Sequence, residues 1–289
     1  MKKVLVILTL IMLTISVSVF GQEVKTEKLT GNIYAVLTGS TVVVFKGDDG
    51  LLIVDTGFEQ VQEQLKQEIK KITNDEAKFI INTHYHNDHT SGNKDLGKFA
   101  TKIAHDKVKY YMSIERNLLG RTIPPDPVEF HPDVTFENDM SIHFNGEEIK
   151  LIHIPSSHTG GDIIVHFTKS NILCIGDLMF GTGRFPYIDL KYGGDIEGNI
   201  KSINMIISKF GEDMTVIPSH SDIIKVKDLK DYVKMLSETV EIVKNAIEQG
   251  KIPEKMKSEN ILKKYDSYGQ GFVKTDSWIE TVYESLTRK

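Results

Sequence analysis

The sequence predicts an α/β (α+β) protein in which two mixed sheets pack face to face and helices cover their outer faces. In the first half, short runs rich in β-branched residues precede an amphipathic helix, and the same order of strands and then helices recurs in the second half. The 289 residues are 40% hydrophobic and 26% charged, which is enough for an extensive core. This composition excludes a disordered or fibrous protein.

The N-terminus has the features of a secretory signal peptide. Two lysines precede an uncharged run from Val4 to Phe20, and the small residue Gly21 follows it. The run approaches the length of a membrane anchor, but no basic stop-transfer cluster comes after it. We therefore expect a signal peptide over residues 1–21, a single domain over 22–289, and a periplasmic or secreted bacterial protein with no stable membrane anchor after cleavage.

Strands and one helix are predicted over residues 31–83. The apolar residues Val61, Leu65, Ile69 and Ile72 recur at helical spacing among Glu, Gln and Lys, which indicates a surface helix. Asp48-Asp49-Gly50 is typical of a hairpin turn. The expected strands cover residues 31–37, 41–45, 51–55 and 78–83.

A second helix is predicted over residues 106–117, before the stretch Pro124–Pro127, through which no helix can continue. The order of strands and then helices is repeated after this stretch. Strands are then expected at 140–144, 148–154, 162–167, 171–175 and 215–217, with helices at 195–209 and 227–246. Cys174, the single cysteine, lies in an apolar strand and is expected to be a plain core residue.

Potential metal ligands are concentrated directly after the strand at 78–83. Residues 84–89 read His-Tyr-His-Asn-Asp-His, and imidazole and carboxylate groups are the ligands that zinc accepts. His158, Asp177 and His220 lie in later loops at the ends of predicted strands. Because loops at strand ends can converge at one rim of a sheet, we expect these residues to form one metal site.

The pattern of these residues, together with Asp55-Thr56-Gly57, resembles the metallo-β-lactamase superfamily over essentially the whole mature chain. The resemblance implies an αββα sandwich in which Asp55 supports the site from behind. It implies that His84, His86 and His158 hold one metal, that Asp88, His89 and His220 hold a second, and that Asp177 bridges the two. One departure is Pro218-Ser219-His220-Ser221, where Pro-Gly-His-Gly is usual; the ligand is retained but the turn is expected to change.

The aspartate at position 177 indicates which members of this superfamily the chain resembles more closely. Zinc β-lactamases commonly carry Cys or Ser there, so the chain resembles the Asp-bridged dinuclear hydrolases more closely. The implied cofactors are two Zn²⁺ ions, and the hard carboxylate also admits iron or manganese. The implied reaction is attack of a metal-bound hydroxide on the carbonyl of an ester, thioester, lactone or amide, with Asp88 orienting the nucleophile.

Three alternative functions remain open. They are β-lactamase activity, a mononuclear iron dioxygenase of the persulfide-oxidising kind, and a non-catalytic metal-binding accessory protein of a periplasmic redox system. The net charge of −5 and the lack of a dense basic stretch after the N-terminus speak against nucleic acid as a partner. A small-molecule substrate is expected.

Substrate contacts are expected from the glycine-rich segment 178–194, which carries Arg184 and Tyr187. The stretch Pro124–Pro127 is a candidate for the opposite wall of the pocket. Asp162 is expected to hydrogen-bond the loop that carries His158, and so to support the site indirectly.

Overall fold

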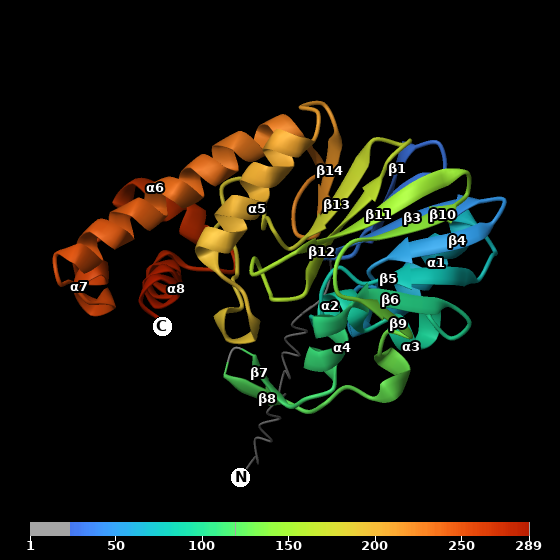
Figure 1. Cartoon of the computed structure of the whole chain (residues 1–289), viewed down its shortest axis with the longest axis horizontal. Coiled ribbons are helices and arrows are strands. Elements are labelled where there is room, and N and C mark those ends of the chain that lie inside the picture. The colour runs from blue at the N-terminus through green and yellow to red at the C-terminus, as the bar shows by residue number, and fades with distance from the viewer. Residues whose placement is uncertain (1–23, 119, 289) are drawn as a thin grey trace, which may run out of the picture.

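The computed structural model describes residues 24–118 and 120–288 (Figure 1). The predicted signal peptide, residues 1–21, lies outside the described residues. The first sheet has the strand order β1-β2-β3-β4-β5-β6-β9 and is antiparallel up to β4 and parallel from β4 onward. Its strands are β1 (Lys25–Thr30), β2 (Ile33–Leu37), β3 (Thr41–Gly47), β4 (Gly50–Val54), β5 (Ala77–Ile81), β6 (Thr101–His105) and β9 (Val134–Phe136).

The second sheet is also mixed, with the order β10-β11-β12-β13-β14-β15 and one parallel pair, β13 with β14. Its strands are β10 (Met140–Phe144), β11 (Glu147–Ile154), β12 (Asp162–Phe167), β13 (Ile172–Gly176), β14 (Thr215–Pro218) and β15 (Ile224–Lys225). A separate hairpin joins β7 (Arg116–Leu118) to β8 (Arg121–Ile123). Ile33, Val43 and Leu52 of the first sheet pack with Leu151 and Val165 of the second, which forms the core between them.

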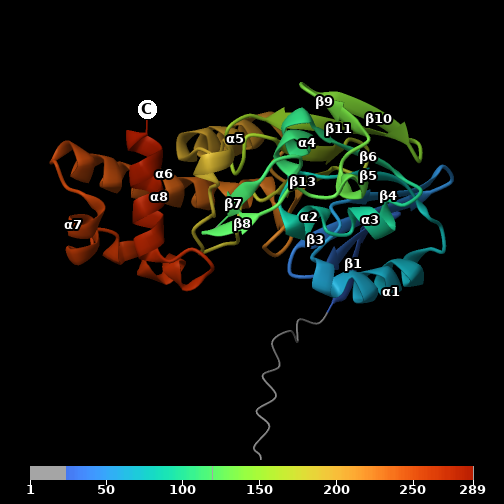
Figure 2. The same cartoon turned by 90° about the horizontal axis from the view of Figure 1, so that it is seen from below.

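Helices cover the outer face of each sheet, so the expected four-layer αββα arrangement is confirmed (Figures 1 and 2). Leu65, Ile69 and Ile72 of α1 are buried against the first sheet, and α5, α6 and α8 pack on the second. The helices are α1 (Gln62–Ile72), α2 (Asn87–Thr90), α3 (Asn93–Leu96), α4 (Asp106–Met112), α5 (Ile196–Lys209), α6 (Leu229–Glu248), α7 (Pro253–Ser258) and α8 (Thr275–Thr287). Short 3₁₀ helices are η1 (Glu59–Val61), η2 (Val128–Phe130), η3 (Leu190–Tyr192), η4 (Val226–Asp228) and η5 (Lys263–Gln270).

Two local predictions need correction. The helix expected over residues 106–117 ends at Met112. Arg116 is buried and forms an ion pair with Asp126 at 2.6 Å, and it begins the strand β7 instead of continuing the helix. The strand expected over residues 78–83 ends at Ile81, so the histidine cluster follows it in a loop and in α2.

Cys174 is buried in the core between the sheets, as expected, and its burial raises the pKa of the thiol. Over residues 24–118 and 120–288, no helix is both long enough and apolar enough to cross a membrane.

Candidate metal centre

The seven predicted ligands meet where strands of both sheets end. The cluster at residues 84–89 follows β5, Asp177 follows β13, His220 follows β14, and His158 lies between β11 and β12. They form two groups that share Asp177, and the ligand atoms within each group lie within 4.8 Å of one another. One group is His84, His86, His158 and Asp177, and the other is Asp88, His89, Asp177 and His220. The structure therefore brings together every residue that the sequence singled out as a ligand.

Three histidines and one oxygen of Asp177 face one another in the first group. Nδ1 of His86 lies 3.0 Å from Nε2 of His84 and 2.9 Å from Nε2 of His158. Oδ2 of Asp177 lies 3.6 Å from Nε2 of His158 and 3.8 Å from Nε2 of His84. His86 presents Nδ1 where the other two present Nε2. His86 is the N-cap residue of α2 and does not belong to a strand. The rings of His84 and His86 are therefore not placed by the alternation of side chains along a regular strand.

The second group has two carboxylates facing two histidines. Oδ2 of Asp88 lies 3.2 Å from Nε2 of His89 and 3.0 Å from Nε2 of His220. Oδ1 of Asp177 lies 3.2 Å from Nε2 of His89, and its Oδ2 lies 3.2 Å from Nε2 of His220. Asp177 thus directs oxygens at both groups, which is the position required of a bridging ligand.

In each of the five histidines, the second ring nitrogen has a polar partner on the outer side of the site. A carbonyl or carboxylate partner accepts an N–H, so in the neutral imidazole the inward nitrogen keeps its lone pair for a metal. The contacts are His84 Nδ1 to Thr83 Oγ1 at 3.2 Å, His86 Nε2 to Asp189 Oδ2 at 3.1 Å, His89 Nδ1 to Asp55 Oδ2 at 2.8 Å, His158 Nδ1 to Tyr187 O at 2.8 Å, and His220 Nδ1 to Gly39 O at 2.8 Å.

Asp55 lies behind His89, as expected. Its carboxylate accepts hydrogen bonds from the backbone N–H of Thr83 at 2.8 Å, from the Thr83 hydroxyl at 2.7 Å, and from Nδ1 of His89. The residue has φ +58°, in the left-handed region that non-glycine residues rarely adopt. Such strain persists where surrounding contacts over-determine a position, as these three hydrogen bonds do.

Asp189 supports the other side of the site and was not expected from the sequence. It is buried, contacts Nε2 of His86 and accepts a hydrogen bond from the hydroxyl of Tyr85. Burial and the charge of Asp189 raise the pKa of Tyr85, so this phenol stays protonated and donates. Asp189 is one acidic residue in a glycine-rich segment more than 100 residues from His86, so no local pattern marks it. The only sequence feature that could have indicated a buried partner on this side of the site was Tyr85, an aromatic residue between two candidate ligands.

Asp162 holds the loop that carries His158. It accepts hydrogen bonds from the backbone N–H of Thr159 at 2.8 Å and from the Thr159 hydroxyl. Burial of its carboxyl group raises its pKa to about 8. The same loop is fastened to the segment after Asp177, because Asp189 N–H donates to the carbonyl of His158 at 2.8 Å. Gly194 permits this approach, since a Cβ there would lie 2.3 Å from that carbonyl oxygen.

The two groups differ in their charge. Burial lowers the pKa of His158 to about 4 and that of His84 well below its usual value, so these two imidazoles of the first group are neutral. In the second group burial disfavours the charged form of each histidine, but the nearby carboxylates favour it more strongly. They raise the pKa of His220 to about 10 and that of His89 well above its usual value. The pKa values of Asp88 and Asp177 are held well below the usual range because these imidazolium charges outweigh burial.

These residues fit divalent metal ions. Nε2 of His89 and Oδ1 of Asp177 are buried side-chain atoms without a hydrogen-bond partner, although unsatisfied buried polar atoms are costly. Both point into the second group. Imidazole nitrogens and carboxylate oxygens with outer hydrogen bonds are the donor set of zinc and related cations.

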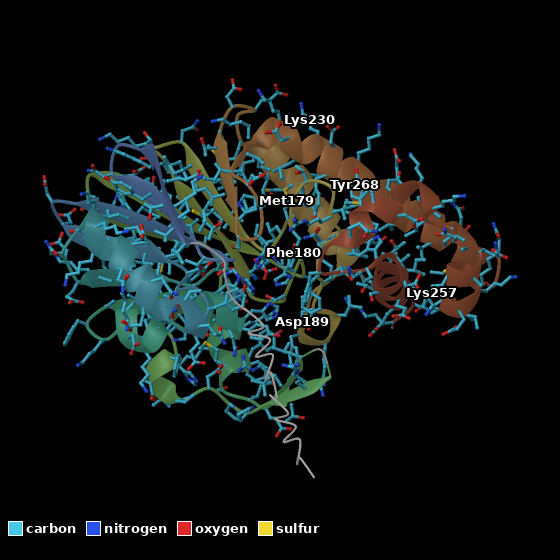
Figure 3. The ribbon with its side chains drawn as sticks, turned by 180° about the vertical axis from the view of Figure 1, so that it is seen from behind. Met179, Phe180, Asp189, Lys230, Lys257 and Tyr268 are labelled. Carbon is cyan, nitrogen blue, oxygen red and sulfur yellow. The ribbon has the colours of Figure 1, made fainter. Side chains whose placement is uncertain are left out.

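A cavity of about 650 Å³ opens above the second group, with Asp88, Asp177 and His220 among its lining residues. Arg184 and Tyr187, the two expected substrate residues, both line it. The stretch Pro124–Pro127 does not, so the wall expected there is wrong; Leu118 of the β7–β8 hairpin lies at the cavity instead. Figure 3 shows Phe180 and Asp189 at the junction between the sheets and the C-terminal helices.

Comparison with known proteins gives relatives of several kinds. "Beta-lactamase-like protein 2 homolog" of Drosophila melanogaster is 22% identical over 199 residues, covering 65% of this chain and 61% of that protein. "Hydroxyacylglutathione hydrolase" of Gloeobacter violaceus is 35% identical over 104 residues, covering 36% of this chain and 35% of that protein. The chain therefore matches less than two thirds of the length of either relative.

The fold also matches solved structures. A metallo-beta-lactamase from Pontibacter korlensis superposes with a TM-score of 0.62 at 17% identity, covering 74% of this chain and 99% of that one. The sequence model of the family described as "Metallo-beta-lactamase superfamily" matches residues 35–226, which include all seven candidate ligands and Asp55. This chain belongs to the metallo-beta-lactamase superfamily, whose members are mostly metal-dependent hydrolases.

Proposed function

We propose that this chain is an exported hydrolase with two zinc ions that attacks the carbonyl carbon of a small ester, thioester, lactone or amide and breaks its acyl C–O, C–S or C–N bond. The observation that carries the proposal is the pair of four-residue groups sharing Asp177, at the floor of a cavity large enough for such a molecule. His84, His86 and His158 would hold one ion, Asp88, His89 and His220 the other, and Asp177 would contact both. When bound, a zinc ion lowers the pKa of a coordinated water to about 7, which supplies a nucleophile at neutral pH.

Asp88 is placed to handle the proton of that nucleophile. Its carboxylate belongs to the second group and also lines the cavity. Because its pKa is held well below the usual range, it is ionised at neutral pH and can accept a hydrogen bond. The Ser40 hydroxyl donates to the backbone carbonyl of Asp88 at 2.7 Å, which fixes this part of the chain. Asp88 would therefore orient the attacking water by accepting a hydrogen bond from it.

Tyr187 and Arg184 are placed to bind the substrate. Burial raises the pKa of Tyr187, so its hydroxyl remains a donor that can contact the carbonyl oxygen or the leaving group. Arg184 makes no ion pair within residues 24–118 and 120–288, although it lines the cavity. Its guanidinium is therefore available for a negative group of the substrate.

Metal content and chelator-sensitive hydrolysis together test the proposal. The mature protein is purified and its zinc, iron and manganese are measured. It is then screened with nitrocefin, a lactone series and a thioester series before and after chelation. We expect about two zinc ions per chain and hydrolysis that chelation removes and zinc restores. Absence of both metal and chelator-sensitive hydrolysis refutes the proposal.

The same screen separates the alternatives. Cleavage of nitrocefin alone would identify a β-lactamase, and one iron per chain with oxygen consumption on persulfides would identify a dioxygenase. Full metal occupancy without turnover of any substrate would favour an accessory protein. Replacing Asp88 by Ala should lower hydrolysis at least 100-fold while the fold is kept, as judged by circular dichroism. An unchanged rate would reject its role.

A further inference from the structure

The part of the chain that follows the family's shared region returns to the cavity. The family match ends at residue 226, and α6, α7, η5 and α8 come after it. Figure 2 shows α7 and α8 at the side of the molecule away from α1. The turn between η5 and α8 nevertheless places Phe272 at the cavity, with 65% of its surface exposed. A second partly exposed phenylalanine, Phe58, lines the same cavity from the loop after β4 and is 37% exposed.

The turn that carries Phe272 is held against the segment that follows Asp177. The backbone N–H of Phe185 donates to the carbonyl of Tyr268 at 3.3 Å, and the ring of Phe185 stacks on Trp278 with centroids 5.2 Å apart. A Cβ on Gly271 would lie 3.1 Å from Cδ of Arg184, so the two segments approach closely. The ring of Phe272 meets that of Tyr187 edge to face, with centroids 6.1 Å apart. Phe272 is therefore positioned by its neighbours.

One part of the cavity wall is formed by candidate metal ligands, His86, Asp88, Asp177 and His220. The remaining wall is largely apolar and also carries Arg184. Its apolar and aromatic members are Phe58, Val61, Leu118, Phe180, Phe185, Tyr187 and Phe272. Exposed aromatic rings lining an otherwise apolar cavity are suited to bury a hydrophobic group of a ligand.

We propose that Phe272, together with Phe58, binds the hydrophobic group of the substrate, so that the protein acts on carbonyl compounds with an aryl or long acyl group. This rests on the proposed hydrolase function and adds the substrate class to it. Phe272 contacts a part of the substrate remote from the reacting carbonyl, and it comes from the segment outside the family match. It therefore determines specificity without belonging to the metal centre.

Ligand binding and hydrolysis test this in parallel. The first measurement is the affinity of the mature protein for 4-phenylbutanoate and for acetate, by isothermal titration calorimetry. The second is kcat/KM for the 4-nitrophenyl esters of the same two acids. Phe272→Ala is compared with Phe99→Ala, which also removes an exposed phenylalanine, 73% exposed, but at a different surface from the cavity.

We expect wild-type protein to bind 4-phenylbutanoate more tightly than acetate and Phe272→Ala to weaken that binding about tenfold. The ratio of kcat/KM between the phenylbutanoate and acetate esters should fall by a similar factor, mostly through KM. Phe99→Ala should leave the binding and the ratio at wild-type values, and Phe272→Leu should recover part of both.

The inference is overturned if 4-phenylbutanoate binds no better than acetate, or if Phe272→Ala binds it as wild type does. It is also overturned if Phe99→Ala has the same effect as Phe272→Ala. If wild-type protein hydrolyses no ester, thioester, lactone or amide, the proposed function fails, and the calorimetric comparison still decides whether Phe272 and Phe58 bind a hydrophobic group.

Discussion

Replacing Asp55 by Asn should weaken metal binding at the group that contains His89. The wild-type carboxylate uses two oxygens to accept hydrogen bonds from three donors: the N–H and hydroxyl of Thr83 and Nδ1 of His89. An amide has one oxygen and one NH₂ group. If its oxygen stays on the Thr83 N–H, the NH₂ group faces Nδ1 of His89 and favours the tautomer with the proton on Nε2, which cannot bind a metal. If the amide flips, the buried Thr83 N–H loses its acceptor.

The size of the effect follows from these two outcomes. Loss of a hydrogen bond that orients a metal-binding histidine lowers metal affinity about 10- to 100-fold, or about 1.4 to 2.8 kcal/mol. A buried donor without an acceptor costs about 1 to 3 kcal/mol of folding stability. We therefore expect Asp55→Asn to lose affinity for one metal ion and to lower the stability of the metal-free protein by no more than this amount.

Chelator competition and urea unfolding measure the two quantities. The matched control is Glu147→Gln, because Glu147 is also buried and accepts hydrogen bonds from Lys169 N–H, Ser170 N–H and the Ser170 hydroxyl. It lies at the start of β11, while His158 follows the end of that strand. The control should lose stability and keep wild-type metal affinity. Wild-type affinity for both ions in Asp55→Asn would refute the reasoning.

Three further predictions concern other parts of the molecule. Asp189→Asn should lower metal affinity about tenfold at the group that contains His86; chelator competition showing a loss at the His89 group instead would contradict it. Burial and the stacked His105 ring lower the pKa of His153 to about 4, whereas the same group has a pKa of about 6.5 in the unfolded chain. The folded state therefore binds fewer protons than the unfolded state and is destabilised as the pH falls from about 6.5 to 4. After allowance for partial exposure, His153→Gln should remove about 1 to 2 kcal/mol of this acid sensitivity in urea unfolding at pH 7 and pH 4.5, whereas the exposed His143→Gln should not. Trp278→Ala should cost about 3 to 5 kcal/mol in the same assay at pH 7, because the indole is fully buried and donates to Thr239 at 3.1 Å; a loss below 1 kcal/mol would contradict it.

The layered fold could be predicted because hydrophobic periodicity reports burial directly. The spacing of Leu65, Ile69 and Ile72 predicted α1, and the β-branched runs predicted most strands of both sheets. The sheet strands β1, β6, β9 and β15 and the hairpin strands β7 and β8 were not predicted. β1 is largely polar and sits at a sheet edge, and β9 is three residues long, so their hydrogen bonds to neighbouring strands define them.

The set of candidate ligands could be predicted because each of them lies after a strand and belongs to a dense or spaced His and Asp pattern. The groups that orient the ligands could be predicted only in part. Asp55 and Asp162 lie near motif residues, but Asp189 reaches His86 only after the segment 178–195 folds back on the His158 loop. The backbone carbonyls of Tyr187 and Gly39 contact the outer nitrogens of His158 and His220. Every residue has a backbone carbonyl, so the sequence alone does not indicate which of them faces a histidine.

The candidate metal ligands and the phenylalanine proposed to bind the substrate lie in different parts of the chain. Every candidate ligand lies at or before residue 220, whereas Phe272 and half of the residues that hold its turn, Tyr268, Gly271 and Trp278, lie beyond residue 226. Substitutions in the last quarter of the chain can therefore reshape the wall that faces the substrate while the metal ligands stay the same. If Phe272 binds the substrate as proposed, an exchange of this segment between related chains should change substrate preference without replacing a candidate ligand, provided that the stacking of Phe185 on Trp278 is kept.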